Sequence, residues 1–166
     1  MNRREDRVTY YIGKKVKKGR NVKIWHYAYV GDNAEIGDNV SIGALAHVDY
    51  MTVVGANTRI EGLAYIAPLS NIGKDVFIGP AVALINDRYP PSKRLEGVTI
   101  GDGAIIGAKS VIGSGCTIGN NSVVCMGAVV TKDVPPETVV MGNPAKAAYS
   151  RSKYDKKKHI WEKKIK

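Results

Sequence analysis

The chain has 166 residues, 44% of them hydrophobic, and its 25 Lys and Arg against 15 Asp and Glu give a formal charge of +10. This is enough apolar material for one domain, but no apolar stretch approaches the roughly 18 residues of a membrane span, and the first residues, MNRREDR, lack the apolar segment of a secretory signal. Two cysteines are too few for a disulfide framework, so we expect Cys116 and Cys125 to be free thiols in a reducing cytoplasm.

The positive charge is concentrated at the two ends of the chain. Residues 1–20 and residues 151–166 each carry a net +6, which leaves a net −2 for the long segment between them. Basic ends on a near-neutral body are compatible with nucleic-acid binding, but runs of this kind are more often solvated faces. We therefore expect neither a nucleic-acid nor a membrane partner.

From residue 12 onward the sequence repeats with a period of six. Ile12 with Gly13 fits the phase, and Lys18 is a degenerate position. An aliphatic residue then recurs without a miss at Ile24, Val30, Ile36, Ile42, Val48, Val54, Ile60, Ile66, Ile72, Ile78 and Leu84. A small or β-branched residue stands two positions before each of these, and glycine often follows.

Each hexad predicts a short strand with one face inward, followed by a turn. Three strands and three corners make a coil of 18 residues, and coils stack at about 4.8 Å. The interior is a narrow triangle, which suits a chain with a single Phe. Glycine after the aliphatic residue is expected to supply corner dihedral angles that other residues resist. The sequence therefore predicts an all-β parallel β-helix; an antiparallel sandwich would need strands of irregular length.

The repeat is interrupted once, at residues 84–97, LINDRYPPSKRLEG. Leu84 and the next aliphatic position, Ile100, are sixteen residues apart, which is one hexad plus ten inserted residues. The insertion predicts a loop pushed out of one corner, and functional residues concentrate on loops held by rigid scaffolds. A loop that only braces a trimer is the alternative, and the two roles are compatible.

Steps of 18 residues place one outward residue of each coil in a column that leads to this loop: Tyr29, His47, Tyr65 and Ala83. Such a column would make a wall for a sugar or a base, and a subunit interface filled by aromatic residues explains it equally well. Outward apolar residues such as Val53, Phe77 and Ile105 give a three-sided prism apolar surface to hide. We therefore expect a homotrimer.

After the loop the six-residue period resumes at Ile100, Ile106, Ile112, Ile118, Val124 and Val130. These positions place Cys116 inward and Cys125 at a corner. The last residues, RSKYDKKKHIWEKKIK, predict a basic helix with Tyr154, Trp161 and Ile165 on one face. That helix would cap the stack or pack on a neighbouring subunit.

The Ile/Val-Gly hexapeptides, the interrupting loop and the closing GAVVTKDVPPETVVMGNPAK resemble the hexapeptide-repeat acyltransferases, over roughly residues 10–148. The segments NVKIWHYAYV, DVFIGPAVALINDRYP and GNPAK look most like N-acetyltransferases of nucleotide-diphosphate-linked amino sugars. The resemblance implies a left-handed parallel β-helix domain at 1–148 with its loop at 86–97, followed by a basic helical tail at 149–166. It also implies a homotrimer and acetyl-CoA as cosubstrate, without a metal.

The loop residues bear on the kind of acceptor. In many relatives a loop histidine is the general base for a hydroxyl acceptor, but this loop holds Asn86, Asp87 and Arg88 and no histidine. An amine acceptor relaxes that requirement. Asn86 lies where the amino-sugar relatives have a loop asparagine, so we expect its side chain to position the acceptor. Asp87 is expected to receive a proton from the amine or to bind its ammonium form. Arg88 joins Tyr29, His47 and Tyr65 as expected substrate-binding residues.

On the donor side, the resemblance points to the later coils. Gly107 and Ala108, then Gly127 and Ala128, form small corners about one coil apart, where a pantetheine arm would lie against backbone N–H groups. It also implicates Lys146, in GNPAK, for a phosphate of coenzyme A. The lysines of the C-terminal tail would suit these phosphates too, which spacing alone does not show.

Other functions remain as alternatives. The runner-up is O-acetylation of a sugar or antibiotic hydroxyl. A zinc carbonic anhydrase on this fold needs three histidine ligands. His26 and His47 fall on different faces and His159 lies in the tail, so the sequence argues against it. A trimeric scaffold or a basic nucleic-acid-binding protein is the non-enzymatic alternative, against which the loop and the intact closing motif argue.

Overall fold

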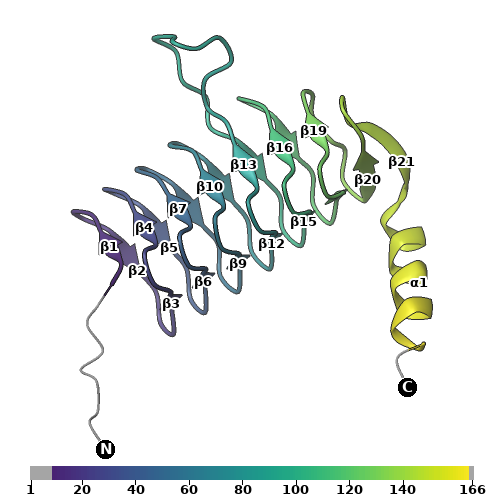
Figure 1. Cartoon of the computed structure of the whole chain (residues 1–166), viewed down its shortest axis with the longest axis horizontal. Coiled ribbons are helices and arrows are strands. Elements are labelled where there is room, and N and C mark those ends of the chain that lie inside the picture. The colour runs from purple at the N-terminus through teal and green to yellow at the C-terminus, as the bar shows by residue number, and fades with distance from the viewer. Residues whose placement is uncertain (1–8, 165–166) are drawn as a thin grey trace, which may run out of the picture.

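The computed structural model describes residues 9–164, which form a parallel β-helix with three sheets (Figure 1). Sheet A contains β1 (Tyr11–Ile12), β4 (Tyr29–Val30), β7 (His47–Val48), β10 (Tyr65–Ile66), β13 (Ala83–Leu84), β16 (Val111–Ile112) and β19 (Val129–Val130). Sheet B contains β2 (Lys17–Lys18), β5 (Glu35–Ile36), β8 (Val53–Val54), β11 (Asn71–Ile72), β14 (Thr99–Ile100) and β17 (Thr117–Ile118). Sheet C contains β3 (Lys23–Ile24), β6 (Ser41–Ile42), β9 (Arg59–Ile60), β12 (Phe77–Ile78), β15 (Ile105–Ile106), β18 (Val123–Val124), β20 (Thr138–Met141) and β21 (Lys146–Ser150).

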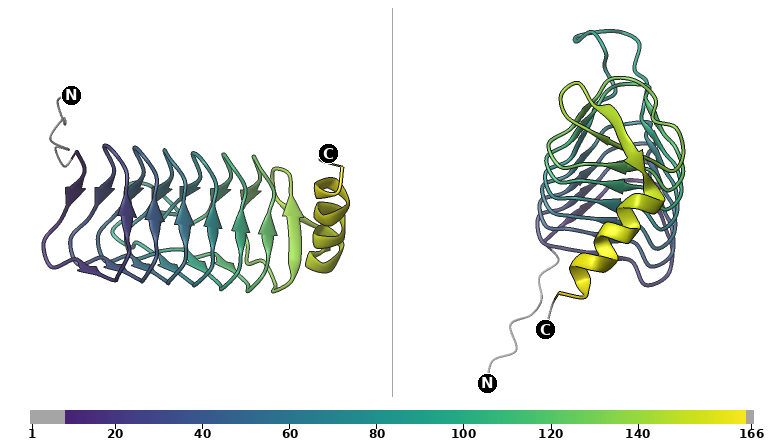
Figure 2. Two further views of the ribbon diagram at one scale, coloured as in Figure 1. Left: turned by 90° about the horizontal axis from the view of Figure 1, so that it is seen from below. Right: turned by 90° about the vertical axis from the view of Figure 1, so that its right-hand side faces the viewer.

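The strand register confirms the predicted period. From β1 to β13, neighbouring strands are parallel and pair residues 18 apart, as in Tyr29 with His47. Across the loop the same pairing joins residues 28 apart, as in Ala83 with Val111, because the ten inserted residues leave the stack. The degenerate position Lys18 is a true strand residue, in β2. The stack therefore continues through the interruption without a change of architecture (Figure 2).

The core is the narrow interior that the hexads predict. The aliphatic position is fully buried from Val30 to Ile118, and small residues such as Ala34, Ala64 and Thr52 face it. Burial of one such aliphatic side chain stabilises the fold by about 1.5–3 kcal/mol. The single Phe, Phe77, lies on an outward position of β12, in keeping with an interior that has no room for large rings.

The predicted reason for the hexad glycines is wrong. The left-handed backbone at most corners belongs to a residue two positions later, often asparagine, as at Asn33 and Asn39. The hexad glycines are needed for close approach between coils: a Cβ on Gly31 would lie 2.4 Å from the backbone N of Tyr50. Gly127, one of the few glycines with a positive φ, has instead nothing within 4 Å of that position.

The inserted segment leaves the stack where sheet A turns into sheet B, between β13 and β14, and projects from it (Figure 1). The amide of Glu96 donates to the carbonyl of Asn86 at 2.8 Å, which closes the neck of the loop. On the stack side, the Ile85 amide donates to the Ile112 carbonyl at 2.9 Å. The predicted loop is thus anchored at its base and free of the sheets beyond it.

The chain ends in an antiparallel hairpin of β20 and β21 and a helix, α1 (Arg151–Glu162), which confirms the predicted C-terminal helix. Ser150 caps it, and Arg151 donates to the carbonyls of Gly103 and Asn121 on the last coils. Of the predicted face, Tyr154 is half-buried and Trp161 is 65% exposed, whereas Ile165 lies outside the described residues. The helix lies across the C-terminal end of the stack (Figure 2). No helix within residues 9–164 is long and apolar enough to cross a membrane.

Candidate active site

Asp87 is bound to its own loop. One carboxylate oxygen accepts from the Tyr89 amide at 3.0 Å and the Ser92 hydroxyl at 2.7 Å, and the other from the Ser92 amide at 2.9 Å. The Ser92 hydroxyl and amide, followed by the Tyr89 amide, hold the pKa of this carboxyl below its usual range. A carboxylate with both oxygens occupied and a lowered pKa is a poor proton acceptor, so the geometry favours a structural role.

Asn86 differs from Asp87 and Arg88, whose side chains are bonded to other residues. It is half-buried at the neck of the loop, and its side-chain amide has no hydrogen-bond partner among residues 9–164. A cavity of about 370 Å³ at the base of the loop is lined in part by Asp87, Arg88 and Cys116, but not by Asn86 itself. The Arg88 guanidinium donates to the Ser114 carbonyl at 3.2 Å and so closes one wall. Burial raises the pKa of the Cys116 thiol, which keeps it protonated.

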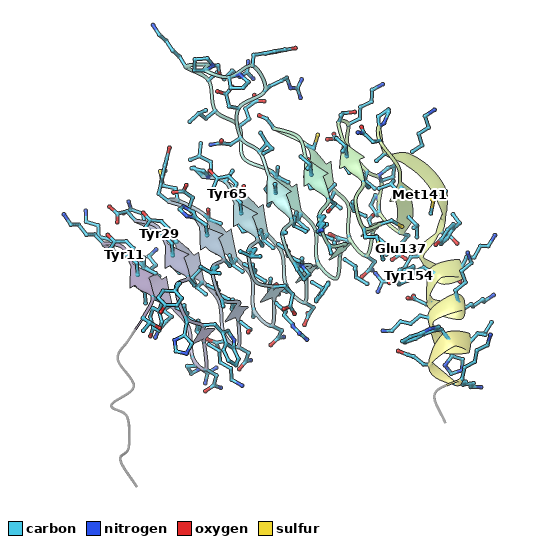
Figure 3. All side chains as sticks on the ribbon, in the orientation of Figure 1. Tyr11, Tyr29, Tyr65, Glu137, Met141 and Tyr154 are labelled. Carbon is cyan, nitrogen blue, oxygen red and sulfur yellow. The ribbon has the colours of Figure 1, made fainter. Side chains whose placement is uncertain are left out.

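The aromatic column forms as the spacing predicts, and Tyr11 extends it by one coil (Figure 3). Ring centroids of Tyr11 and Tyr29 are 4.9 Å apart, those of Tyr29 and His47 are 4.3 Å apart, and those of His47 and Tyr65 are 5.4 Å apart. Tyr65 pairs with Ala83, the strand residue just before the loop. The column therefore runs along sheet A to the neck of the loop.

Asp49 belongs to this face and was missed by the sequence analysis. Its carboxylate lies 3.3 Å from the Nε2 atom of His47, and its side chain is only 18% exposed. Burial, with Asp49 as the next cause, raises the pKa of the Tyr65 hydroxyl. The available signal was that Asp49 occupies a position where most hexads have glycine.

The proposed donor residues are contiguous at the corner that joins sheet C to sheet A. The Gly127 amide donates to the Ala108 carbonyl at 2.9 Å, and the amides of Gly107 and Lys109 are bonded to neighbouring coils. The amide of Ala108 has no acceptor among the described residues. Lys14 occupies the same position within its own hexad, and its amide donates to the carboxylate of Asp32, the residue one coil on. The residue one coil on from Ala108 is Met126, which has no carboxylate. Ala108 thus offers a free N–H beside a small side chain.

The other donor residues have different surroundings. Ala128 faces the core and is fully buried, so only its backbone is open to a ligand. The turn before Lys146 stacks directly beyond this corner, because the Val129 amide donates to Gly142 and the Ala145 amide to Val129. Lys157 of α1 lies 4.4 Å from the centre of the Tyr149 ring, near the same end of the stack. The donor residues therefore adjoin a basic region.

Within one chain the loop and the donor corner do not meet. The loop leaves at the edge between sheets A and B, whereas Ala108 lies at the edge between sheets C and A. One side of the coil, six residues or up to about 20 Å if extended, separates these two edges. Along the stack they are close, because β13 and β16 are neighbours. No group of three or more His, Cys, Asp or Glu within residues 9–164 is arranged to hold a metal ion.

Comparisons with known proteins also point to hexapeptide-repeat transferases. The profile of a family described as bacterial transferase hexapeptide (six repeats) matches residues 19–49 and 97–132. Over 89 residues the chain is 39% identical to the 2,3,4,5-tetrahydropyridine-2,6-dicarboxylate N-acetyltransferase of Staphylococcus aureus, a match that covers 53% of this chain and 36% of that enzyme. The chain therefore spans little more than a third of the length of the curated relatives that it matches.

Solved structures give the same fold. A hexapeptide-repeat acetyltransferase from Vibrio cholerae matches with a TM-score of 0.60 at 25% identity, over 80% of this chain and 72% of that one. Its complex with acetyl-CoA matches with a TM-score of 0.52 at 26% identity, over 86% and 70%. A maltose O-acetyltransferase from Clostridium difficile matches with a TM-score of 0.52 at 25% identity, over 90% and 79%.

Repeat, loop and fold together define a hexapeptide-repeat β-helix protein. The matching profile and these relatives make the chain similar to hexapeptide-repeat acetyltransferases.

Proposed function

We propose that the protein transfers an acetyl group from acetyl-CoA to the amine of a nucleotide-diphosphate-linked amino sugar. The observation that carries the proposal is the state of the loop. Asn86 has a free amide, whereas the carboxylate of Asp87 is bonded to its own loop and that of Glu96 is ion-paired with Arg94. A site that orients an acceptor but offers no free base in its loop suits an acceptor with its own lone pair, which is an amine.

The donor side supports acetyl-CoA. The relative from Vibrio cholerae is known with acetyl-CoA bound. In this chain, a row of small residues with the free N–H of Ala108 leads toward Lys146 and Lys157 at the basic end of the stack. An extended pantetheine arm would lie along such a row, with its phosphates at the lysines. These features favour coenzyme A over a compact donor.

In the proposed reaction the amine nitrogen attacks the thioester carbonyl carbon. The carbonyl oxygen then carries negative charge, for which the Ala108 N–H is a suitable donor. The intermediate collapses by breaking the carbon–sulfur bond, and the proton leaving the nitrogen is taken up by the thiolate or by solvent. The Asn86 amide holds the acceptor in place, and orientation of this kind lowers a barrier by several kcal/mol.

The site is completed by a second copy of the chain. Because the loop and the donor corner lie on opposite edges of sheet A, a neighbour in a closed three-fold assembly would bring its donor corner to this loop. We therefore include a homotrimer in the proposal, with each acetyl transfer taking place between two copies.

A hydroxyl acceptor is the second candidate, and one observation favours it. The Asp49 carboxylate beside His47 is the arrangement that orients an imidazole as a general base. Maltose O-acetyltransferase is among the folds that the chain matches. If a neighbouring copy brought His47 to the acceptor, a hydroxyl could be deprotonated there.

A thiol-release assay decides between the two candidates. Acetyl-CoA is offered with nucleotide-linked 3-amino and 4-amino sugars, and with the matching sugars that carry a hydroxyl in place of the amine. Release with the amino sugars alone is the expected result. Release with the hydroxyl sugars alone would establish the alternative, and release with neither would overturn a nucleotide-sugar acceptor.

A further inference from the structure

A groove of about 710 Å³ lies on the first three coils, on sheet C and the corner that leads from it to sheet A. Its walls include Lys23, Trp25, Arg59 and Glu61, and none of its lining comes from the loop or from the donor corner. The volume is within the range of small-molecule sites, about 300–1,000 Å³. Neither the acceptor nor the donor residues described above account for it.

Two side chains in the groove break the repeat. Trp25 and Glu61 stand directly after the aliphatic residue, where the coil between them has Gly43. The glycine leaves the floor open between a large ring and a carboxylate. The Trp25 indole is 55% exposed and so presents a face to solvent. Indole faces stack on nucleobases, and a carboxylate accepts hydrogen bonds from the hydroxyls of a ribose.

Two cations lie on the outward side of the same groove. Lys23 pairs with Ser41 and Ser41 with Arg59 in the sheet register, so the backbones of the two cationic residues are two coils, or about 9.6 Å, apart. The small serine between them leaves space and adds a hydroxyl. Arg59 is held in place by an ion pair with Glu61 and by the Phe77 ring, 5.8 Å from its guanidinium carbon. Two cationic side chains on one groove suit a ligand with two linked phosphates.

The backbone adds donors of its own. The amides of Ala44 and Gly62, both in the groove lining, have no acceptor among residues 9–164. The following coil has Gly62 and Pro80 at these positions, and neither has a side chain that could accept from the N–H groups. Free backbone amides next to fixed cations are the usual surroundings of a bound phosphate.

We propose that this groove binds a nucleoside diphosphate, with the base on Trp25, the ribose at Glu61 and the phosphates between Lys23 and Arg59. The diphosphate can belong to a nucleotide-linked sugar, to coenzyme A or to a free nucleotide, since all share this chemistry. Binding here does not depend on the proposed acetyl transfer, because the groove shares no residue with the loop or the donor corner.

Trp25 allows a direct test. The chain has two tryptophans, so Trp161→Phe leaves Trp25 as the single reporter. In that background, uridine, thymidine, guanosine and adenosine diphosphates and coenzyme A are titrated separately while Trp25 emission is followed. We expect saturable quenching by at least one, which names the source, and at least tenfold weaker binding of inorganic diphosphate, which lacks the ring.

The variants Lys23→Gln and Arg59→Gln should each lower the affinity for the ligand that gave saturable quenching by at least tenfold. Arg94→Gln is the matched control, because Arg94 forms the same kind of ion pair with Glu96, two residues on, but in the loop. Thermal melts check folding, and Arg59→Lys should restore part of the affinity. Absence of quenching by all five ligands, or equal affinity in Arg59→Gln and Arg94→Gln, would overturn the proposal. The thiol-release assay is scored separately, so failure of one proposal leaves the other standing.

Discussion

Asp87 directs both carboxylate oxygens at its own loop, and this decides which loop residue remains to handle an acceptor. The residue type alone allows either a proton acceptor or a turn former. The choice depends on Ser92, five residues further on, whose hydroxyl and amide meet the carboxylate only after the loop has its conformation. A sequence pattern carries no such information, whereas the free amide of Asn86 follows from its place at the loop neck.

We expect Asn86→Ala to lower kcat of the amine acetylation by roughly ten- to a hundred-fold, or about 1.5–3 kcal/mol. The variant lets the bound amine rotate and removes the hydrogen bond that would orient it. Single-turnover and steady-state rates measure the loss. His47→Asn is the companion variant, expected to act mainly on substrate affinity; if it abolished turnover while binding survived, His47 would be the base and a hydroxyl acceptor would be favoured.

Asp87→Asn should loosen the loop, because the amide replaces one acceptor oxygen with a donor that faces other donors. The lowered pKa of Asp87 means that its contribution to loop order is complete above the ordinary pKa of about 3.9. It is lost only as the pH falls through the lower, folded value. Hydrogen-exchange protection of the Tyr89 and Ser92 amides should be constant from pH 8 to 5 in the native chain. In Asp87→Asn it should be severalfold lower throughout; a native loop that lost protection near pH 6 would contradict this.

At the scale of the elements, the period of six predicted the strands from β1 to β19, because each pair of residues has to bury one side chain in a triangular core. The closing hairpin of β20 and β21 lies outside that period. The corners were harder to predict. A recurring glycine shows that a Cβ atom is unfavourable at that position. It does not show whether the cause is a left-handed backbone conformation or a lack of space for the atom. Asp49, Trp25 and Glu61 could have been found from the sequence, since each replaces a hexad glycine.

Gly31→Ala and Gly127→Ala separate those two reasons. At Gly31 the new methyl would lie 2.4 Å from the Tyr50 amide nitrogen, in the backbone of the next coil, which cannot move without opening the stack. At Gly127 the methyl enters open space, and the cost is the left-handed conformation alone, about 1–2 kcal/mol. Denaturant unfolding should show the larger loss for Gly31→Ala. A larger loss for Gly127→Ala would instead show that the backbone conformation, and not the space between coils, is the main reason for the glycines.

The donor corner is tested by a bulky side chain. Ala108→Trp should fill the row of small residues and weaken acetyl-CoA binding more than tenfold, or about 1.4 kcal/mol, by calorimetry. Ala56→Trp is the matched control, because Ala56 is the second residue of a corner on another edge and is half-buried like Ala108. Unchanged affinity in Ala108→Trp, in a protein that melts normally, would move the donor site elsewhere.

For the whole molecule, the three edges of the prism differ in chemistry. The edge between sheets B and C carries a hydrogen-bonded ladder through Asn21, Asn39, Asn57 and Asp75. The two edges that border sheet A carry exposed apolar residues instead: Tyr27, Leu45 and Leu63 on one, and Met51 and Leu69 on the other. All five have a positive φ, which is unfavourable for such side chains. The polar edge suits solvent, and the two apolar edges suit each other.

This pattern refines the trimer expected from Val53, Phe77 and Ile105. Those residues face outward on sheets B and C, but only Val53 is strongly exposed, at 41%, whereas Tyr27 and Leu63 reach 71% and 61%. The sequence analysis identified the apolar outward positions of the strands but not the apolar residues at the corners. A corner residue is assigned only to a turn until the residues one coil away, which lie beside it, are known. In the proposed trimer, sheet A with its aromatic column would face the three-fold axis.

Leu45→Asn with Leu63→Asn tests that assembly. Asparagine tolerates the left-handed backbone better than leucine, so the single chain should be at least as stable in the double variant as in the native protein. The edge loses the apolar surface that would pack against a neighbouring copy. Sedimentation should show a trimer for the native protein and a monomer for the double variant. The monomer should bind acetyl-CoA yet lose acetyl transfer, because the loop of one copy then lacks the donor corner of the next. Asp75→Asn, on the polar edge, is the control and should remain trimeric. A native chain that sediments as a monomer at micromolar concentration, or an active double variant that is monomeric, would place the whole reaction within one copy.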